Sequence, residues 1–154
     1  MKHTIRRARP TEADVLSRVA YEAKASWGYP VEWMAAWREE LTITPEYVTN
    51  HEVFVADTGG SIAGIAALEA FEGGVALEHV WVATHRQGEG VGHDLVRYAL
   101  AAAKRAGHVV VRVISDPNAV GFYLRFGAQM KGSVPAPMPG APQRVLPVLE
   151  LALE

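Results

Sequence analysis

Three glycines in the second half of the chain have the spacing of an anion-binding loop. Gly88, Gly90 and Gly92 alternate with other residues between a strand-like apolar run and a helical pattern. Glycine permits a positive φ and leaves no side chain between the backbone and a bound group. Successive N–H groups at a helix start converge on an anion, which the helix dipole also favours. The sequence therefore predicts a loop that binds a phosphate or a pyrophosphate.

The two common nucleotide-binding motifs do not fit this loop. A P-loop requires a lysine after its last glycine, where this chain has His93. The dinucleotide fingerprint has glycines at its first, third and sixth positions, and the sixth position counted from Gly88 is again His93. The loop is thus predicted to bind a phosphate-containing ligand in a way that differs from a P-loop and from a dinucleotide-binding loop.

Two ionisable residues precede the loop in the strand-like run 75–84. Glu78 could accept a proton from an ammonium group, and His79 competes for that role because imidazole titrates near neutral pH. Alternation along a strand predicts that their side chains point to opposite faces, so that only one faces a substrate. Proton transfer through a chain of water molecules would need neither.

The elements that position these residues follow an alternating order. Helices are predicted after Thr11, after Pro30 and from Thr44, then at 91–106, and in a short segment that Asn118 caps. Strands are predicted at 3–9, 52–57, 61–71, 75–84, 109–115 and 144–153. This order predicts an α/β (α+β) protein with a single domain over residues 1–154.

The composition excludes several classes of function. The 154 residues have a formal net charge of −2, which provides no basic field for nucleic acid or for an anionic membrane. The absence of cysteine excludes disulfides, thiolate metal sites and an acyl-cysteine intermediate. The six histidines show no helical pairing, so we expect no metal. The start of the chain lacks a signal-peptide pattern, and we expect a cytoplasmic protein.

Two motifs carry a resemblance to a known family. The spacing Gln87-x-x-Gly90-x-Gly92 resembles the acyl-CoA signature of the GNAT N-acetyltransferase superfamily. The segment 116–128 resembles the second signature of that family, with Asn118, Tyr123 five residues later, and an aromatic residue followed by glycine. The opening IRRARPTEAD is also similar to a GNAT start, so the resemblance covers nearly the whole chain.

The resemblance implies a fold and a reaction. The fold is a central mixed sheet of about six or seven strands flanked by helices, whose fourth and fifth strands, at 76–83 and 108–114, run parallel and splay apart. The reaction is direct transfer of an acetyl group from acetyl-CoA to a primary amine of a small molecule or a peptide, without an acyl-enzyme. The family also makes a homodimer plausible.

The resemblance further implies roles for individual residues. Tyr123 would be the general acid beside the thioester sulfur, and Glu78 the general base. Trp27 and Tyr29 fall in the region that covers the acceptor site. The cofactor-binding residues would be Val80, Trp81 and Val82 along the pantetheine arm, the loop residues Gln87, Gly88, Glu89, Gly90, Val91, Gly92 and His93 around the pyrophosphate, and Asn118 and Tyr123 near the arm.

Two alternatives stay open at this stage. A non-catalytic acyl-CoA-binding module would keep the glycine loop but could dispense with Glu78 and Tyr123. Tyr123 could also be a core residue of its amphipathic helix, because Phe122 and Phe126 flank it. Glycines that bind a pyrophosphate do not specify the acyl chain, so another acyl donor is a further alternative.

Overall fold

The structure, a computed structural model, describes residues 3–154 and contains a seven-stranded mixed sheet. The strands follow the order β1-β2-β3-β4-β5-β7-β6, and every neighbouring pair is antiparallel except β4 and β5. The strands are β1 (Thr4–Arg7), β2 (Glu52–Asp57), β3 (Ile62–Phe71), β4 (Gly74–Val82), β5 (Val110–Ile114), β6 (Gln129–Pro135) and β7 (Val145–Ala152). The helices are α1 (Ala13–Ala25), α2 (Val31–Leu41), α3 (Pro45–Asn50), α4 (Val91–Arg105) and α5 (Val120–Leu124).

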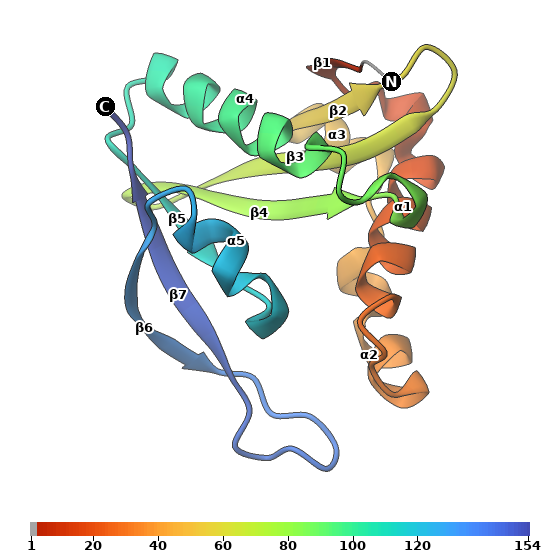
Figure 1. Ribbon diagram of the computed structural model, residues 1–154, viewed down its shortest axis with the longest axis vertical. Coiled ribbons are helices and arrows are strands. Elements are labelled where there is room, and N and C mark those ends of the chain that lie inside the picture. Colours follow the sequence, from red (N-terminus) through yellow and green to blue (C-terminus); the bar gives the residue numbers. More distant parts are fainter. Residues whose placement is uncertain (1–2) are drawn as a thin grey trace.

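The helices cover the sheet from both sides (Figure 1). Alternation along β2 shows the two faces: Val53 and Val55 pack in one buried cluster with α1, α2 and α3, whereas Phe54 packs in another with α4 and α5. The strands β2 and β3 therefore bury both of their faces over most of their length. The mixed sheet flanked by helices confirms the predicted fold class.

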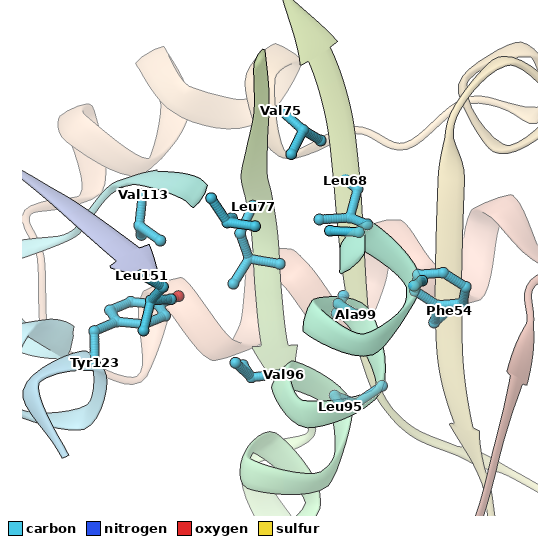
Figure 2. Packing of buried hydrophobic residues seen from close by; sticks show 14 of the residues in the cluster. Phe54, Leu68, Val75, Leu77, Leu95, Val96, Ala99, Val113, Tyr123 and Leu151 are labelled. Carbon is cyan, nitrogen blue, oxygen red and sulfur yellow. The ribbon is translucent and has the colours of Figure 1, made fainter. Parts of the chain in front are cut away.

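Helix α4 packs tightly because its apolar residues recur at helical spacing. Leu95, Val96 and Ala99 are all fully buried against β3 and β4 (Figure 2). The helix ends where the sequence predicts, just before Gly107, which has a φ of 96° and so adopts the left-handed conformation that ends many helices. This packing fixes the start of α4, and with it the glycine loop, against the end of β4.

The parallel strands β4 and β5 meet at a single position and then separate. Their only paired residues are Ala76 and Arg112, although β4 continues to Val82 and β5 to Ile114. In Figure 1, α5 lies beside this opening, between β4 and β7. The splayed parallel pair predicted from the family resemblance is thus present at the fourth and fifth strands.

A β-bulge interrupts β4 at Glu78. Ala67 of β3 pairs with His79, but the next residue, Leu68, pairs with Leu77, so Glu78 has no partner. A bulge inserts one residue and shifts the alternation that follows it. Leu77 and Val80 consequently pack in the same cluster, and Glu78 and His79 both lie between them. The prediction that these two side chains point to opposite faces is wrong.

The segment after β5 differs from the prediction in two ways. The side chain of Asp116, and not that of Asn118, begins the helical segment, because its carboxylate accepts a hydrogen bond from the Asn118 N–H at 2.8 Å. The strand β6 follows α5 and pairs with β7, although the sequence analysis predicts no strand between the Asn118-capped segment and 144–153. Nearly all residues of β6 are exposed, so the strand shows no alternation of apolar and polar residues.

A glycine in β3 permits the close packing of α4, and we expect its substitution to be costly. A Cβ at Gly64 would lie 2.8 Å from the Trp81 carbonyl oxygen and 3.1 Å from Val91 Cγ1. Gly64→Ala should therefore destabilise the protein by about 1–3 kcal/mol, as overpacking generally does. The control is Gly60→Ala, where a Cβ meets nothing within 4 Å. Equal urea midpoints for the two variants would contradict this expectation.

Candidate active site

A cavity of about 620 Å³ passes between the splayed strands β4 and β5. Because the strands separate, residues from both faces of the sheet line it, such as Trp37 from the α2 side and Tyr123 from the α5 side. The segment 136–144 between β6 and β7 forms a further wall, through Ala136, Met138 and Arg144. Glu78, His79, Val80 and Trp81 of β4, together with Lys24, Trp27 and Asp116, complete much of the lining.

The backbone of β4 offers free groups to this cavity. The Ala83 N–H donates to the Ala63 carbonyl at 2.8 Å, so the alternation of an antiparallel ladder directs the backbone of Trp81 toward β3 as well. The N–H and C=O groups of Val80 and Val82 then point away from β3, toward the side where β5 has separated. Val80 and Val82 thus present edge groups of the kind that pair with an extended ligand.

The glycine loop has the geometry of an anion-binding helix start. Gly88 and Gly90 have φ values of 85° and 83°, which side chains rarely allow. The first backbone hydrogen bond of helix α4 is donated by the Asp94 N–H to the Gly90 carbonyl. The N–H groups of the helical residues before Asp94 therefore have no partner within the helix. A Cβ at Gly92 would lie 3.3 Å from Val82 Cγ2. The loop therefore brings free N–H groups to the end of β4.

The other predicted loop residues surround these free N–H groups. Gln87 and Glu89 are exposed, and Glu89 accepts a hydrogen bond from Arg86 at 3.0 Å. Val91 is buried beneath the loop and anchors it. The imidazole of His93 stacks on Phe126 of the α5 side, with ring centroids 4.9 Å apart. Side chains and backbone thus leave the outer face of the loop open.

Glu78 is the bulged residue of β4 and lines the cavity. Its carboxyl is partly desolvated by the surrounding protein and lies near the Glu69 carboxylate, and both effects raise its pKa above the usual value for glutamate. The positive charge of Arg112 lowers the pKa of Glu78, but by less than the other two effects raise it. A carboxylate with a raised pKa is a stronger base, so Glu78 is suited to take a proton from an ammonium group.

His79 is held in one neutral form. Burial lowers its pKa to about 4, so the imidazole is uncharged at neutral pH. The indole N–H of Trp81 donates to Nδ1 of His79 at 2.9 Å, and because an indole can only donate, the imidazole proton resides on Nε2. Nδ1 is thus occupied and Nε2 already carries a proton. His79 is arranged as a hydrogen-bond donor, which leaves Glu78 as the better base.

Tyr123 is both a core residue and a cavity residue. Its side chain is only 6% exposed and packs beside Val113 and Leu151 (Figure 2). Burial raises the pKa of its phenol, so the hydroxyl keeps its proton. Among the described residues the hydroxyl has no hydrogen-bond partner, yet it is not one of the fully enclosed unpaired atoms, and Tyr123 lines the cavity. Its hydroxyl is therefore available to a ligand.

A buried ion pair that the sequence analysis missed joins α1 to the end of β5. Lys24 Nζ lies 2.6 Å from Asp116 Oδ2, and both side chains are about nine-tenths buried. Desolvation lowers the pKa of Lys24 against the opposing effect of Asp116. Burial disfavours the charge of Asp116, but the Lys24 hydrogen bond and the Asn118 N–H keep its pKa below the usual range. No local pattern could reveal this pair, since its members are 92 positions apart.

Of the two residues predicted at the acceptor site, Trp27 lines the cavity and Tyr29 does not. Trp27 lines the cavity, is 40% exposed and lies 6.4 Å from the Trp81 ring centroid. Tyr29 instead stacks on Trp33 and donates its hydroxyl proton to Asp116 at 2.9 Å. Asn118 joins the same network, because its Nδ2 donates to the Tyr29 hydroxyl at 2.9 Å. Tyr29 and Asn118 thus support the ion pair.

We expect removal of the lysine to destabilise the fold. Lys24→Met leaves the Asp116 carboxylate buried without its cation, which typically costs about 3 kcal/mol. The double variant Lys24→Met/Asp116→Asn should regain part of that loss, because no uncompensated charge remains. Urea unfolding of both variants measures this, and a double variant no more stable than the single one would count against the argument.

Two absences concern other kinds of site. Within residues 3–154, no helix is both long and apolar enough to cross a bilayer. The same part of the chain holds no group of three or more His, Asp or Glu side chains placed to bind a metal ion.

Comparisons with known proteins agree with this geometry. The family model of the acetyltransferase (GNAT) domain matches residues 15–134. A sequence comparison with curated proteins gives no match. Among solved structures, a GCN5-related N-acetyltransferase from Rhodopseudomonas palustris is similar over 99% of this chain and 97% of its own, with a TM-score of 0.81 and 18% identity.

Two further structures were determined with a ligand. PaiA N-acetyltransferase from Thermoplasma acidophilum, in complex with coenzyme A, has a TM-score of 0.73 and 18% identity over 99% of both chains. YncA from Salmonella typhimurium, with its cofactor acetyl-CoA, has a TM-score of 0.71 and 21% identity over 100% of this chain and 95% of its own. At these identities the likeness shows the shared fold.

The family model covers well over half of the chain, and its matched range includes both the glycine loop and Tyr123. This protein therefore belongs to the GNAT family of acetyltransferases, which confirms the acyltransferase that the glycine loop and the second motif predict.

Proposed function

We propose that the protein, as one domain over residues 1–154, transfers an acetyl group from acetyl-CoA directly to a primary amine. The glycine loop supports this proposal, because its free N–H groups from Gly88 to His93 suit the pyrophosphate of coenzyme A. The coenzyme A and acetyl-CoA in the two similar structures are a further argument. Gln87, Glu89 and Val91 shape the loop around these groups.

The splayed edge of β4 is the proposed site of the pantetheine arm. The N–H and C=O groups of Val80 and Val82 are free to pair with its amides, whereas the backbone of Trp81 pairs with β3. The ring of Trp81 then contributes to the cavity wall. Asn118 precedes α5 and is not among the residues that line the cavity. Its side-chain amide donates to the Tyr29 hydroxyl, so we assign it a supporting role behind the site.

Glu78 starts the proposed reaction by removing a proton from the acceptor ammonium. The neutral amine then attacks the thioester carbonyl carbon, and negative charge develops on the carbonyl oxygen. The Val82 N–H, which points into the opening, is the donor we assign to that oxygen. No side chain becomes acylated, in agreement with the absence of cysteine from the sequence.

Tyr123 completes the proposed transfer. As the carbon–sulfur bond breaks, the Tyr123 hydroxyl donates its proton to the leaving thiolate. The attacking nitrogen loses its second proton as the amide forms, and that proton restores the tyrosine hydroxyl. The raised pKa of Tyr123 keeps its hydroxyl protonated until the thiolate forms. Trp27 and the aromatic side chains of the cavity would hold the acceptor, a small molecule or the end of a peptide.

One observation carries this proposal: the same cavity contains Glu78, the unpartnered hydroxyl of Tyr123 and the free edge of β4. The test is an assay of free-thiol release from acetyl-CoA in the presence of primary amines, with the acetylated amine identified by mass spectrometry. Amine-dependent thiol release with a matching acetamide product is the expected result. Acetyl-CoA binding without turnover of any amine would favour a non-catalytic acyl-CoA-binding module instead.

A further inference from the structure

One cation of the cavity lining lacks a counter-charge from the protein. Arg144, in the segment between β6 and β7, lines the cavity and is half-buried. Across residues 3–154 it forms no ion pair, whereas Lys24, the other cation of the lining, is paired with Asp116 at 2.6 Å. Charges that are withdrawn from water are usually paired with an opposite charge. Arg144 is therefore a candidate for binding an anionic group of a ligand.

The guanidinium of Arg144 has one occupied edge and one free edge. Its Nη1 donates to the Ala136 carbonyl at 3.3 Å. Its Nη2 is enclosed by protein atoms and finds no acceptor in the described part of the chain. Nε has no acceptor there either, but it is not one of the enclosed unpaired atoms, so a ligand can reach it. Nε and Nη2 together form an edge with which arginine pairs with both oxygens of a carboxylate.

The backbone and the neighbouring rings fix the position of this guanidinium. The Arg144 carbonyl accepts a hydrogen bond from the Ala136 N–H at 2.9 Å. The guanidinium carbon lies 5.1 Å from the Trp37 ring centroid and 5.5 Å from that of Trp33. Trp33 in turn donates its indole N–H to the Pro139 carbonyl at 2.9 Å, which holds the segment against α2. A donor that is fixed in this way loses little entropy when it binds an anion.

The carboxylates of the lining gather around Glu78 and not around Arg144. Besides desolvation, Glu69 and Glu40 raise the pKa of Glu78, and Arg112 opposes them. Arg144 is not among the charges that shift this pKa, so its charge is remote from Glu78. The end of the cavity at Glu78 is therefore negative and suits an ammonium group, as the proposed base requires.

Positive charge prevails at the end of the cavity where Arg144 lies. Besides desolvation, like-charge repulsion from Arg144 lowers the pKa of Lys24, and this repulsion outweighs the opposing effect of Glu40. Because Asp116 already balances Lys24, the charge of Arg144 is left over. A ligand with one positive and one negative group would thus be oriented along the cavity, with its ammonium toward Glu78 and its anionic group toward Arg144.

Resting on the proposed acetyl transfer, we propose that the acceptor is an amine that also carries a carboxylate, and that Arg144 binds this carboxylate. The reacting ammonium lies at Glu78, and the carboxylate accepts hydrogen bonds from the free edge of the guanidinium. Trp27 and Trp81, which also line the cavity, contact the carbon chain between the two charges. A plain amine would leave the charge of Arg144 without a partner.

Amino acids compared with their carboxamides test the contribution of the negative charge. Alanine, β-alanine, γ-aminobutyrate and ε-aminocaproate are each compared with the amide of the same chain, which keeps the size and removes the charge. We expect kcat/KM to be about tenfold higher for the acid than for its amide at the chain length that spans the two ends, mainly through a lower KM. Thiol release from acetyl-CoA measures each value on the full chain.

Variants assign the preference to its residue. Arg144→Gln removes the charge and should lower the acid-to-amide ratio of kcat/KM about tenfold. Arg144→Lys keeps the charge without the planar edge and should retain part of the preference. Comparing the same ratio between proteins cancels the difference in amine pKa between each acid and its amide. The matched control is Arg105→Gln, because Arg105 is exposed at the end of α4 and does not line the cavity.

The outcomes distinguish this inference from the proposed function, and acetyl-CoA binding by each variant checks that it is folded. An acid-to-amide ratio near one at every chain length, or a ratio that Arg144→Gln leaves unchanged, would overturn the inference. It would also be overturned if other amines are acetylated while none of the four acids is, and the acetyltransferase proposal would then stand. Failure of the folded protein to bind acetyl-CoA would overturn both.

Discussion

Tyr123→Phe is expected to lower kcat about 10²–10³-fold while the Kd for acetyl-CoA changes by less than about threefold. The substitution removes one hydroxyl from a side chain that is otherwise held by apolar contacts with Val113 and Leu151. Because the described chain offers that hydroxyl no hydrogen-bond partner, its loss leaves no protein group unsatisfied, and we expect the fold to be unaffected. The substitution is then expected to slow the departure of the thiolate, because the hydroxyl acts in that step.

The matched control is Tyr98→Phe. Tyr98 lies on α4, is 38% exposed and packs against Phe54, away from the cavity. Its variant should retain the rate of the unmodified protein. Unchanged turnover in Tyr123→Phe would show that Tyr123 is a core residue and not the acid. A protein that binds acyl-CoA without turnover would show no rate to lose in either variant.

Glu78→Gln is expected to lower kcat/KM about 10²-fold near neutral pH and to change the pH profile. The base must be ionised to act, so activity in the unmodified protein falls as the pH drops through the pKa of Glu78. Partial desolvation and the Glu69 carboxylate raise that pKa more than Arg112 lowers it, which places the acidic limb above the pH at which an ordinary glutamate would titrate. The glutamine variant should lose this limb, together with most of the rate.

The pH profile also separates Glu78 from His79. The pKa of His79 is about 4, so its ring is neutral on both sides of neutral pH and should produce no limb there. Glu72→Gln serves as the control, because Glu72 is an exposed residue of the turn between β3 and β4 and does not line the cavity. An acidic limb that persists in Glu78→Gln would contradict the assignment of Glu78 as the base.

The sequence predicts those parts of the site that depend on local structure. The glycine loop could be predicted because Gly88 and Gly90 need positive φ values and lie between a strand and a helix, all within one short segment. The second motif places Tyr123 on the short α5 helix beside the splay. The helices and most strands follow from the spacing of apolar residues, which is the same in the sequence and in the buried clusters.

The remaining features depend on contacts between distant segments. The bulge at Glu78 arises from the pairing of β4 with β3, and strict alternation within β4 could not reveal it. Lys24 and Asp116 meet only after α1 has packed beside the end of β5. Tyr29 is predicted at the acceptor site because the family resemblance places it, with Trp27, in the region that covers that site, but its hydroxyl donates to Asp116.

The central claim is that the loop from Gln87 to His93 binds the pyrophosphate of acetyl-CoA beside the splayed strands. Calorimetric titration of the purified protein with acetyl-CoA tests it most directly. We expect saturable binding at one site with a Kd of roughly 1 µM, or about −8 kcal/mol. No binding heat at several temperatures from protein shown to be folded would contradict the claim, and would mean that the glycine loop is only a turn between β4 and α4.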